Sequence, residues 1–319
     1  MIFAVWLPLL VPFLAAPVAQ RVTARLSPRT AVWTLTVTTL ALAACSTLAL
    51  GTLLIAGALR LAPIAALEDI QPHWLGAESW WTAPAAIAAA VALGASAGTV
   101  AWRLVRHRRE LREARGESGP TAGDLRVAPH DVPYAYALPG RLGRGGTIVV
   151  SSAMLRALPV AERDALFAHE RAHLRGRHHL FLSTAHLTAA VHPALRALRR
   201  PIAFHLERWA DESAAATVGD RELTARAIGR AALAAQDSRT RPRRPSPVLG
   251  ATSGPVPLRV RALLSPATDT RRTVAGRAWR AVATALLCCL AVSAGSALHA
   301  VVDLHADVET AEIHQTSGP

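Results

Sequence analysis

The chain has 319 residues, 51% of them hydrophobic, and the apolar residues are clumped into long runs, which argues against two ordinary soluble domains. The formal net charge is +13, but no aromatic-interleaved basic motif accompanies it, so we expect no direct contact with nucleic acid. The three cysteines, Cys45, Cys288 and Cys289, all lie in apolar runs, which excludes a disulfide framework and a cysteine zinc site.

Four apolar runs are candidates for membrane-spanning helices. They cover about residues 2–20, 31–58, 84–102 and 281–302, and each reaches or nearly reaches the roughly 20 residues that cross a bilayer. We expect the first run to be a retained helix, because no basic side chain precedes Arg21 as it would in a signal peptide. The composition therefore predicts a mainly α-helical membrane protein with four transmembrane helices in the lipid bilayer.

The arginines predict the orientation of these helices. Three lie between the first two runs and 31 lie between residues 103 and 280, and arginine-rich segments beside membrane helices stay on the cytoplasmic side. Residues 1–102 would hold three helices, 103–280 a cytoplasmic domain, 281–302 the fourth helix and 303–319 a short extracellular tail. We expect a multi-pass protein of the cell membrane with both termini outside.

The predicted cytoplasmic domain contains both strands and helices. After a charged connector, two short strands flank a glycine-rich turn, the second of them at 147–150. A short helix and a longer one after Pro159 follow, and a second helical stretch runs from about 179 to 218 with a break near 192–201. Residues 236–247 are rich in proline and arginine and are typical of a linker. The pattern predicts an α+β domain between the third and fourth membrane helices.

The segment AHERAHLRGRHH, residues 168–179, indicates metal chemistry. His169 and His173 are four residues apart, so on a helix they lie on one face and can share one metal ion. Glu170 adjoins the first of them, where a carboxylate can act as general base on a metal-activated water. This spacing on a predicted helix indicates a peptidase with one zinc ion per chain.

Two residues compete for the position of third ligand. His179 lies three residues after Gly176 and would complete a three-histidine pattern, but that pattern also needs a downstream methionine turn, and both methionines lie upstream. Glu207 lies on a second helix, and Asp211 one turn later could accept the free ring N–H of a histidine ligand. Two histidines and a glutamate leave a fourth position open for water, so we favour Glu207.

These segments resemble a known group of peptidases. IVVSSAMLRALPVAERDALFAHERAHLRGRHH, followed by ERWADESAA, resembles the membrane zinc peptidases of the BlaR/MecR type, and is similar to the related group that contains the heat-shock membrane protease and the CAAX prenyl protease. The resemblance implies a zincin-like domain of the gluzincin clan, with zinc on His169, His173 and Glu207, Glu170 as catalytic base, and the site on the cytoplasmic side. It also suggests that TIVV, residues 147–150, is an edge strand that pairs with an extended substrate.

Two further residues are candidates for contacts with the substrate or its oxyanion. Arg259 lies in PLRVRAL, which resembles a proline-to-arginine element of the heat-shock protease group, and His179 follows the metal motif. The chain departs from the β-lactam sensors of the BlaR/MecR type, which carry a large penicillin-binding domain after the last helix, whereas only residues 303–319 follow it here. Direct antibiotic sensing is therefore not expected.

The sequence as a whole predicts a membrane-embedded zinc endopeptidase that cleaves a protein or peptide on the cytoplasmic side. By analogy with the family, the substrate would be a cytosolic transcriptional repressor in a signalling pathway. One alternative is a quality-control protease that degrades damaged membrane proteins, and substrate breadth separates these two. Another is a non-catalytic membrane scaffold that keeps zinc for structure, for which Glu170→Ala would leave every cellular phenotype unchanged.

Overall fold

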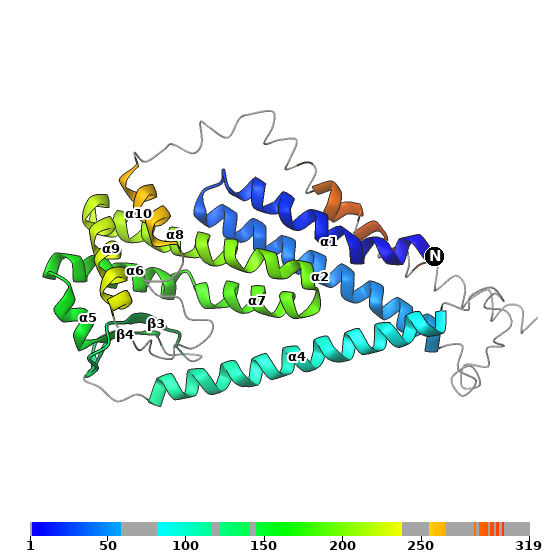
Figure 1. Ribbon diagram of the computed structural model, residues 1–319, viewed down its shortest axis with the longest axis horizontal. Helices are drawn as coiled ribbons and strands as arrows, with labels where there is room; N and C mark the ends of the chain where they lie inside the picture. The colour runs from blue at the N-terminus through cyan, green and yellow to red at the C-terminus, as the bar shows by residue number, and fades with distance from the viewer. Residues whose placement is uncertain are drawn as a thin grey trace, which may run out of the picture.

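The computed structural model describes residues 2–58, 82–116, 121–140, 145–237 and 255–265, together with residues 284, 287–292, 294–296, 298, 299 and 302. The described chain is mostly helical and carries one small sheet at the end of the molecule remote from the N-terminus (Figure 1). The predicted linker at 236–247 lies outside these residues except for its first two positions, and the predicted tail at 303–319 lies outside them altogether.

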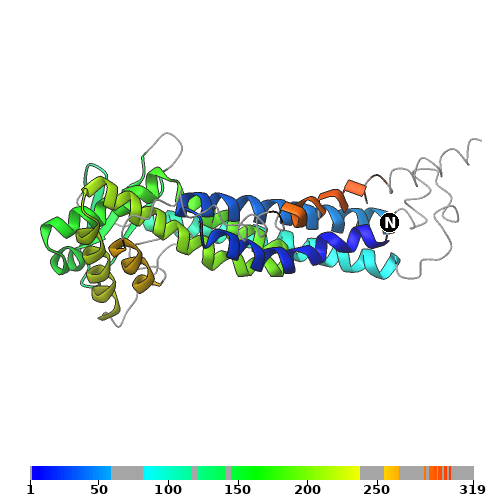
Figure 2. The same ribbon diagram turned by 90° about the horizontal axis from the view of Figure 1, so that it is seen from above.

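Three long apolar helices form the part of the molecule that carries the N-terminus. They are α1 (Ile2–Thr23), α2 (Pro28–Ala58) and α4 (Thr82–Gly116), and each is long and apolar enough to cross a membrane. They run side by side in both views of the elongated molecule (Figures 1 and 2). Helix α4 continues without a break 14 residues beyond the predicted end of its span at 102. The fourth predicted span, 281–302, is described only in part, and all of its described residues are helical.

The sheet has four short strands. They are β1 (Thr121–Ala122), β2 (Leu125–Ala128), β3 (Ala135–Leu138) and β4 (Thr147–Ser151), in the spatial order β1-β2-β4-β3. Strand β4 pairs in parallel with β2 and antiparallel with β3. The expectation that TIVV is an edge strand is therefore wrong. The residues Ile148, Val149 and Val150 are fully buried, as a strand with a neighbour on each side requires, and β3 forms the edge instead.

The helices after the sheet fold back on one another. They are α5 (Ser152–Ala157), α6 (Val160–Arg175), α7 (His178–Val191), the 3-10 helix η2 (Pro193–Leu198), α8 (Arg199–Val218), α9 (Arg221–Asp237) and α10 (Val256–Leu264). Helix α6 begins directly after Pro159 and ends at Gly176. The break predicted near 192–201 is η2, where the chain reverses, so α7 leads away from the sheet and α8 leads back toward it (Figure 1).

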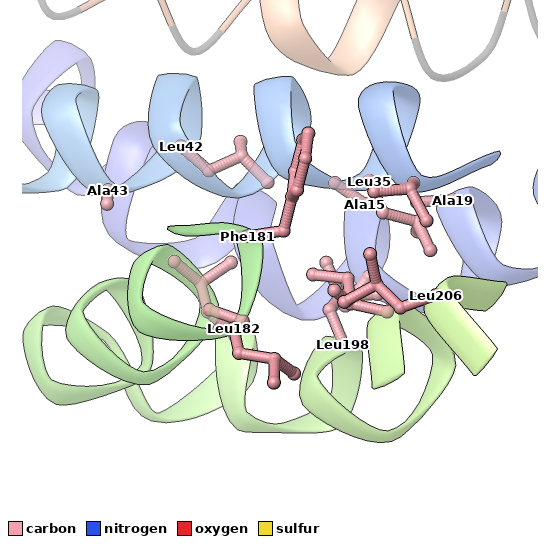
Figure 3. Close-up of a cluster of buried hydrophobic side chains, with 14 of the residues drawn as sticks. Ala15, Ala19, Leu35, Leu42, Ala43, Phe181, Leu182, Leu198 and Leu206 are labelled. Atoms are coloured by element: carbon pink, nitrogen blue, oxygen red, sulfur yellow. The ribbon is translucent and has the colours of Figure 1, made fainter. Parts of the chain in front are cut away.

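One hydrophobic core joins the two halves of the molecule (Figure 3). Small and branched side chains of α1 and α2 pack directly on α7, η2 and α8; this interhelical core includes Ala15, Ala19, Leu35, Leu42, Phe181, Leu182, Leu198 and Leu206. Cys289 and Leu290, in the fourth apolar run, pack against the same core. Helix α7, which directly follows the metal motif, and helix α8, which contains ERWAD, are therefore both packed on the apolar helices.

Candidate metal centre

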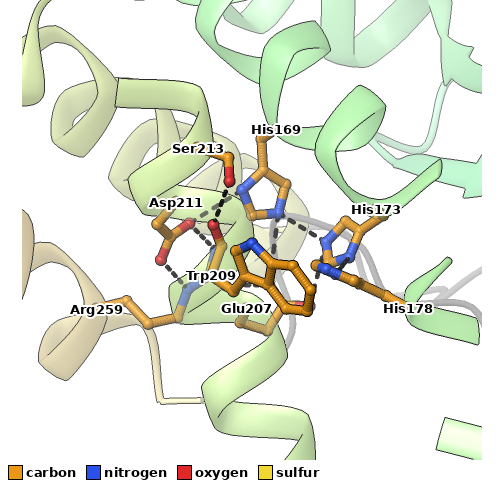
Figure 4. A network of polar contacts seen from close by, with 8 residues as sticks. All are labelled: His169, His173, His178, Glu207, Trp209, Asp211, Ser213 and Arg259. Atoms are coloured by element: carbon orange, nitrogen blue, oxygen red, sulfur yellow. Dashed lines mark hydrogen bonds and ion pairs between the residues drawn. The ribbon is translucent and has the colours of Figure 1, made fainter. Parts of the chain in front are cut away.

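The site is built where α6 crosses α8 (Figure 4). Helix α6 presents His169 and His173 one turn apart, and α8 presents Glu207 toward them. The two Nε2 atoms are 3.1 Å apart, and the Glu207 carboxylate oxygens lie 3.6 Å from the Nε2 of His169 and 3.7 Å from that of His173. Among the residues that the structure describes, these three form the one group of side chains that could hold a metal ion.

The chemistry of this donor set fits a zinc ion. His169 and Glu207 are fully buried, and His173 is 4% exposed. Within the described chain, one oxygen of Glu207 forms an ion pair with Arg259, and no side chain donates a hydrogen bond to the other oxygen. Two nitrogens on a tetrahedral zinc, each at about 2.05 Å, are about 3.3 Å apart, close to the spacing seen here. Two imidazole lone pairs and a carboxylate that converge in a dry interior need a cation between them.

The imidazole of His169 is oriented by a buried ion-pair chain. Its Nδ1 lies 3.0 Å from Asp211 Oδ1, so the ring N–H points at this carboxylate and Nε2 is left as the donor to a metal. Arg259, from α10, donates from Nε and Nη2 to both oxygens of Asp211 at 2.8 and 2.6 Å, and its Nη1 lies 2.7 Å from Glu207. All of these side chains are fully buried. Arg259 therefore holds the ligand carboxylate and the orienting carboxylate together, rather than reaching out toward a substrate.

The imidazole of His173 is oriented by His178, a residue to which the sequence analysis gave no role. His178 is buried, and its Nδ1 lies 2.7 Å from the Nδ1 of His173. If Nε2 of His173 serves the metal, its Nδ1–H donates and His178 accepts. The His178 ring packs on Trp209, with ring centroids 4.6 Å apart, and the guanidinium of Arg29, at the start of α2, lies over the Trp209 ring. A chain of contacts thus connects the site with an apolar helix.

Gly176 makes room for His178. A Cβ at position 176 would collide with the His178 ring, which Trp209 and His173 hold in place. Arg177, between them, has φ +49°, a left-handed conformation that turns the chain back on itself. The glycine two residues before His178 is the signal in the sequence that could have pointed to this residue.

Glu170 is fully buried and directly follows His169 on α6. The positive charge of Arg259 lies close enough to interact with Glu170. A carboxylate at this position can accept a proton from an attacking water and pass it on.

The charges around the site keep two of its histidines neutral. Burial, together with the nearby charges of His169, His178 and Arg259, lowers the pKa of His173 well below its usual range. Burial also lowers the pKa of His178, to about 3. For His169, burial acts to lower the pKa, but Asp211 and Glu207 outweigh it and raise the pKa to about 9. A neutral His173 is the form that binds a metal ion.

His179, the other candidate for third ligand, is not part of this group. It is half-buried at the start of α7, and burial and the nearby charges of His107 and Arg177 lower its pKa. His107 belongs to α4, so one of the charges that act on His179 comes from that helix, and among the described residues His179 does not join the group of His169, His173 and Glu207. A self-contained three-histidine site on residues 169–179 is therefore not what the chain forms.

Comparison with known proteins supports the same chemistry. The model of peptidase family M48 matches residues 121–198, so this part of the chain is a peptidase M48 family domain of the gluzincin metallopeptidases. Peptidases of this family depend on a metal ion, typically zinc. The match runs from β1 to the end of η2 and stops before Glu207, so the third ligand rests on geometry alone. No curated protein and no solved structure matches the chain.

Proposed function

We propose that this protein is an integral-membrane, zinc-dependent endopeptidase that cleaves a protein substrate on the cytoplasmic side. The observation that carries the proposal is the buried convergence of His169, His173 and Glu207 beside Glu170. Three protein ligands leave one position for water or substrate, which distinguishes a catalytic zinc site from a closed structural one.

Each buried side chain has a distinct part in this chemistry. Zinc, when bound, lowers the pKa of a water and polarises the scissile carbonyl. Glu170 accepts the proton of the attacking water and donates it to the leaving amine. Asp211 and His178 fix the ring orientation of the two histidine ligands, and Arg259 fixes the carboxylates of Glu207 and Asp211. Because these partners are buried, the ligands are held in position before a substrate arrives.

We propose that β3 holds the substrate. Among the described strands it pairs with β4 alone, and an edge strand presents unpaired main-chain donors and acceptors to an extended peptide. Ala135 of β3 and Leu166 of α6 belong to one hydrophobic cluster, so the edge strand is packed on the helix that carries the metal ligands. A peptide added to β3 would therefore run close to the site.

The membrane placement is supported by the exposed surface of the apolar helices. Large side chains of α1, α2 and α4 are exposed, including Leu14 at 67% and Ile87 at 66%, and a continuous surface of this kind is not stable in water. The arginines of 21–29 and 103–115 lie at or beside those ends of the helices that are nearest the sheet (Figure 1). The positive-inside rule then puts the metal centre on the cytoplasmic side, with both termini outside.

A comparison of new protein N-termini in cells that carry the wild type or Glu170→Gln tests this function. Glutamine keeps the shape of the side chain but cannot take up a proton, so we expect cleavage to stop while the protein still folds and binds zinc. One or two new N-termini, one of them in a cytosolic repressor, would support a role in signalling, whereas many would indicate quality control. If both cell types have the same N-termini, the protein is a scaffold and the proposed activity is wrong.

A further inference from the structure

A cavity of about 220 Å³ lies between α4 and α7, away from the metal centre. Its lining comes from the middle of α4, from Ser183, His186 and Leu187 of α7, and from Arg199, the first residue of α8. His186 is eight residues beyond His178, about 12 Å along the helix. The cavity therefore lies nearer to the apolar part of the molecule than the metal centre does. It is between α4 and α7, which diverge in Figure 1.

The cavity is lined mainly by cationic side chains. Arg103, Arg106 and Arg199 all contribute to its wall, together with two histidines, and Glu110 is its one acidic lining residue. Glu110 is bound by Arg106 at 2.8 Å, so this pair is close to neutral. Within the described chain, no carboxylate lies at ion-pair distance from Arg103 or Arg199. Two guanidinium groups with no counterion among the described residues provide the charge that attracts an anion.

Some of the donors in this wall have no partner within the protein. The Nε of Arg199 and the Nδ1 of His107 are buried, and neither makes a hydrogen bond to a described residue. Arg199 uses Nη2 to contact the Nε2 of His186 at 2.7 Å, and Arg103 donates to the main-chain carbonyl of His186. These contacts hold the guanidinium groups in place while leaving donors unsatisfied. A buried polar group without a partner is costly, so an additional acceptor is expected here.

The position of the cavity along α4 indicates the source of such an acceptor. Its wall includes Trp102 and Leu104, and Trp102, at the end of the third apolar run, is 58% exposed. Tryptophan at the end of an apolar helix marks the level of lipid headgroups. The apolar run before Trp102 and the arginines after it put the cavity at the boundary between hydrocarbon and cytoplasm.

We propose that this cavity binds the phosphate of an anionic phospholipid from the cytoplasmic leaflet. Arg103 and Arg199 would contact the phosphate oxygens, with Ser183 and His107 as further donors, and Trp102 and Leu104 would face the glycerol and the start of the acyl chains. The volume equals about seven waters at about 30 Å³ each, enough for a phosphate and the glycerol carbons next to it. The inference rests on the proposed membrane placement but not on the proteolytic activity.

Native mass spectrometry of the detergent-purified full chain, titrated with phosphatidylglycerol or phosphatidylcholine, tests the proposal. We expect the wild type to prefer phosphatidylglycerol. The double variant Arg103→Gln/Arg199→Gln should bind it about thirtyfold more weakly, from the usual contribution of two basic residues at a membrane surface. Arg108→Gln is the matched control, because Arg108 is exposed on the same helix and outside the cavity wall, and it should weaken binding much less than the double variant.

A second variant separates lost binding from lost folding. Glu110→Gln removes the acidic side chain of the wall and should tighten phosphatidylglycerol binding, a gain that a damaged protein would not show. The proposal is wrong if the two lipids bind equally, if Arg108→Gln weakens binding as much as the double variant, or if millimolar inorganic phosphate displaces the lipid and so identifies a soluble ligand. Zinc bound per chain is read from the same spectra, so failure of the peptidase proposal is visible separately.

Discussion

The two histidine ligands of the candidate metal centre lie on the same helix, but they are held by different chemistry (Figure 4). His169 is oriented by the anion Asp211, which Arg259 binds in turn. His173 is oriented by the neutral imidazole of His178, which rests on Trp209. A charged partner fixes one ligand, and a neutral partner that is held by packing fixes the other.

The difference also connects the ligands to different parts of the molecule. The Asp211 side leads to α10, a short helix between two segments outside the described residues. The His178 side leads through Trp209 to Arg29 and α2, and so to the apolar helices. Removing a buried charge leaves its partner unpaired, whereas removing a packed neutral ring leaves a space, so the two sides should respond differently to substitution.

The largest expected effect comes from Arg259→Met. The substitution keeps the apolar stem but leaves Asp211 and Glu207 buried without their counterion, which should lower the free energy of unfolding by roughly 3–5 kcal/mol. Thermal unfolding in detergent measures the loss. Arg261→Met is the matched control, because Arg261 is exposed on the same helix, and it should leave the unfolding temperature nearly unchanged. Equal effects of the two substitutions would show that the ion pairs of Arg259 do not stabilise the fold.

Zinc affinity should separate the two orienting residues. Loss of a partner of a metal-binding histidine usually costs 10–100-fold in affinity. We expect Asp211→Asn to lie near the upper end, about 100-fold, because it removes a charge, and His178→Ala near the lower end, about tenfold. Competition with a zinc chelator measures both.

Gly176→Ala offers an independent check of the His178 side, because the added methyl group pushes on the ring without removing it. It should weaken zinc binding in the same direction as His178→Ala. If His178→Ala reduces affinity as strongly as Asp211→Asn, charge and packing are equivalent here and the comparison fails.

The smallest effect is expected at an exposed ion pair on the same helix. Arg171 of α6 donates to both oxygens of Asp124 at 2.7 and 2.9 Å, and this hydrogen bonding lowers the pKa of Asp124. Because both side chains are about 40% exposed, Asp124→Asn should cost no more than about 0.5 kcal/mol. A lowered pKa stabilises the fold above the unfolded value of about 3.9, so the difference should be constant from about pH 7 to 5 and shrink as the pH falls below about 3.9. Urea unfolding at several pH values measures it; a difference that grows on acidification would contradict the assignment.

Local patterns predicted much of this structure. The lengths of the apolar runs predicted the three long helices α1, α2 and α4. The turn residues around 139–146 separate two strands, and these strands pair with each other. Helix α6 begins after Pro159 and ends before Gly176. The four-residue spacing of His169 and His173 therefore predicted that both side chains lie on one face of this helix. Glu207 and Asp211 could be predicted for the same reason. Two carboxylates one turn apart on a second helix fit the roles of a third metal ligand and of a partner for a histidine ligand.

Contacts between distant segments could not be predicted in this way. Strand β2 is separated from β4 by the 18 residues 129–146 and pairs with it in parallel, and its four residues show no alternation that would reveal this. This pairing places β4 inside the sheet, so the prediction that β4 is an edge strand was wrong. His178 was missed because its burial depends on the left-handed turn at Arg177, an arginine with no propensity for that conformation. The role of Arg259 depends on how α10 docks, which no local pattern encodes.

The most direct test of the central claim is the zinc content of the purified chain. The two-helix site predicts about one zinc per chain in the wild type and in His179→Ala, and loss of zinc in Glu207→Ala. Elemental analysis of the three proteins, after the same dialysis, gives the answer. Zinc that is lost with His179→Ala but kept with Glu207→Ala, or a wild type that binds none, would contradict the account.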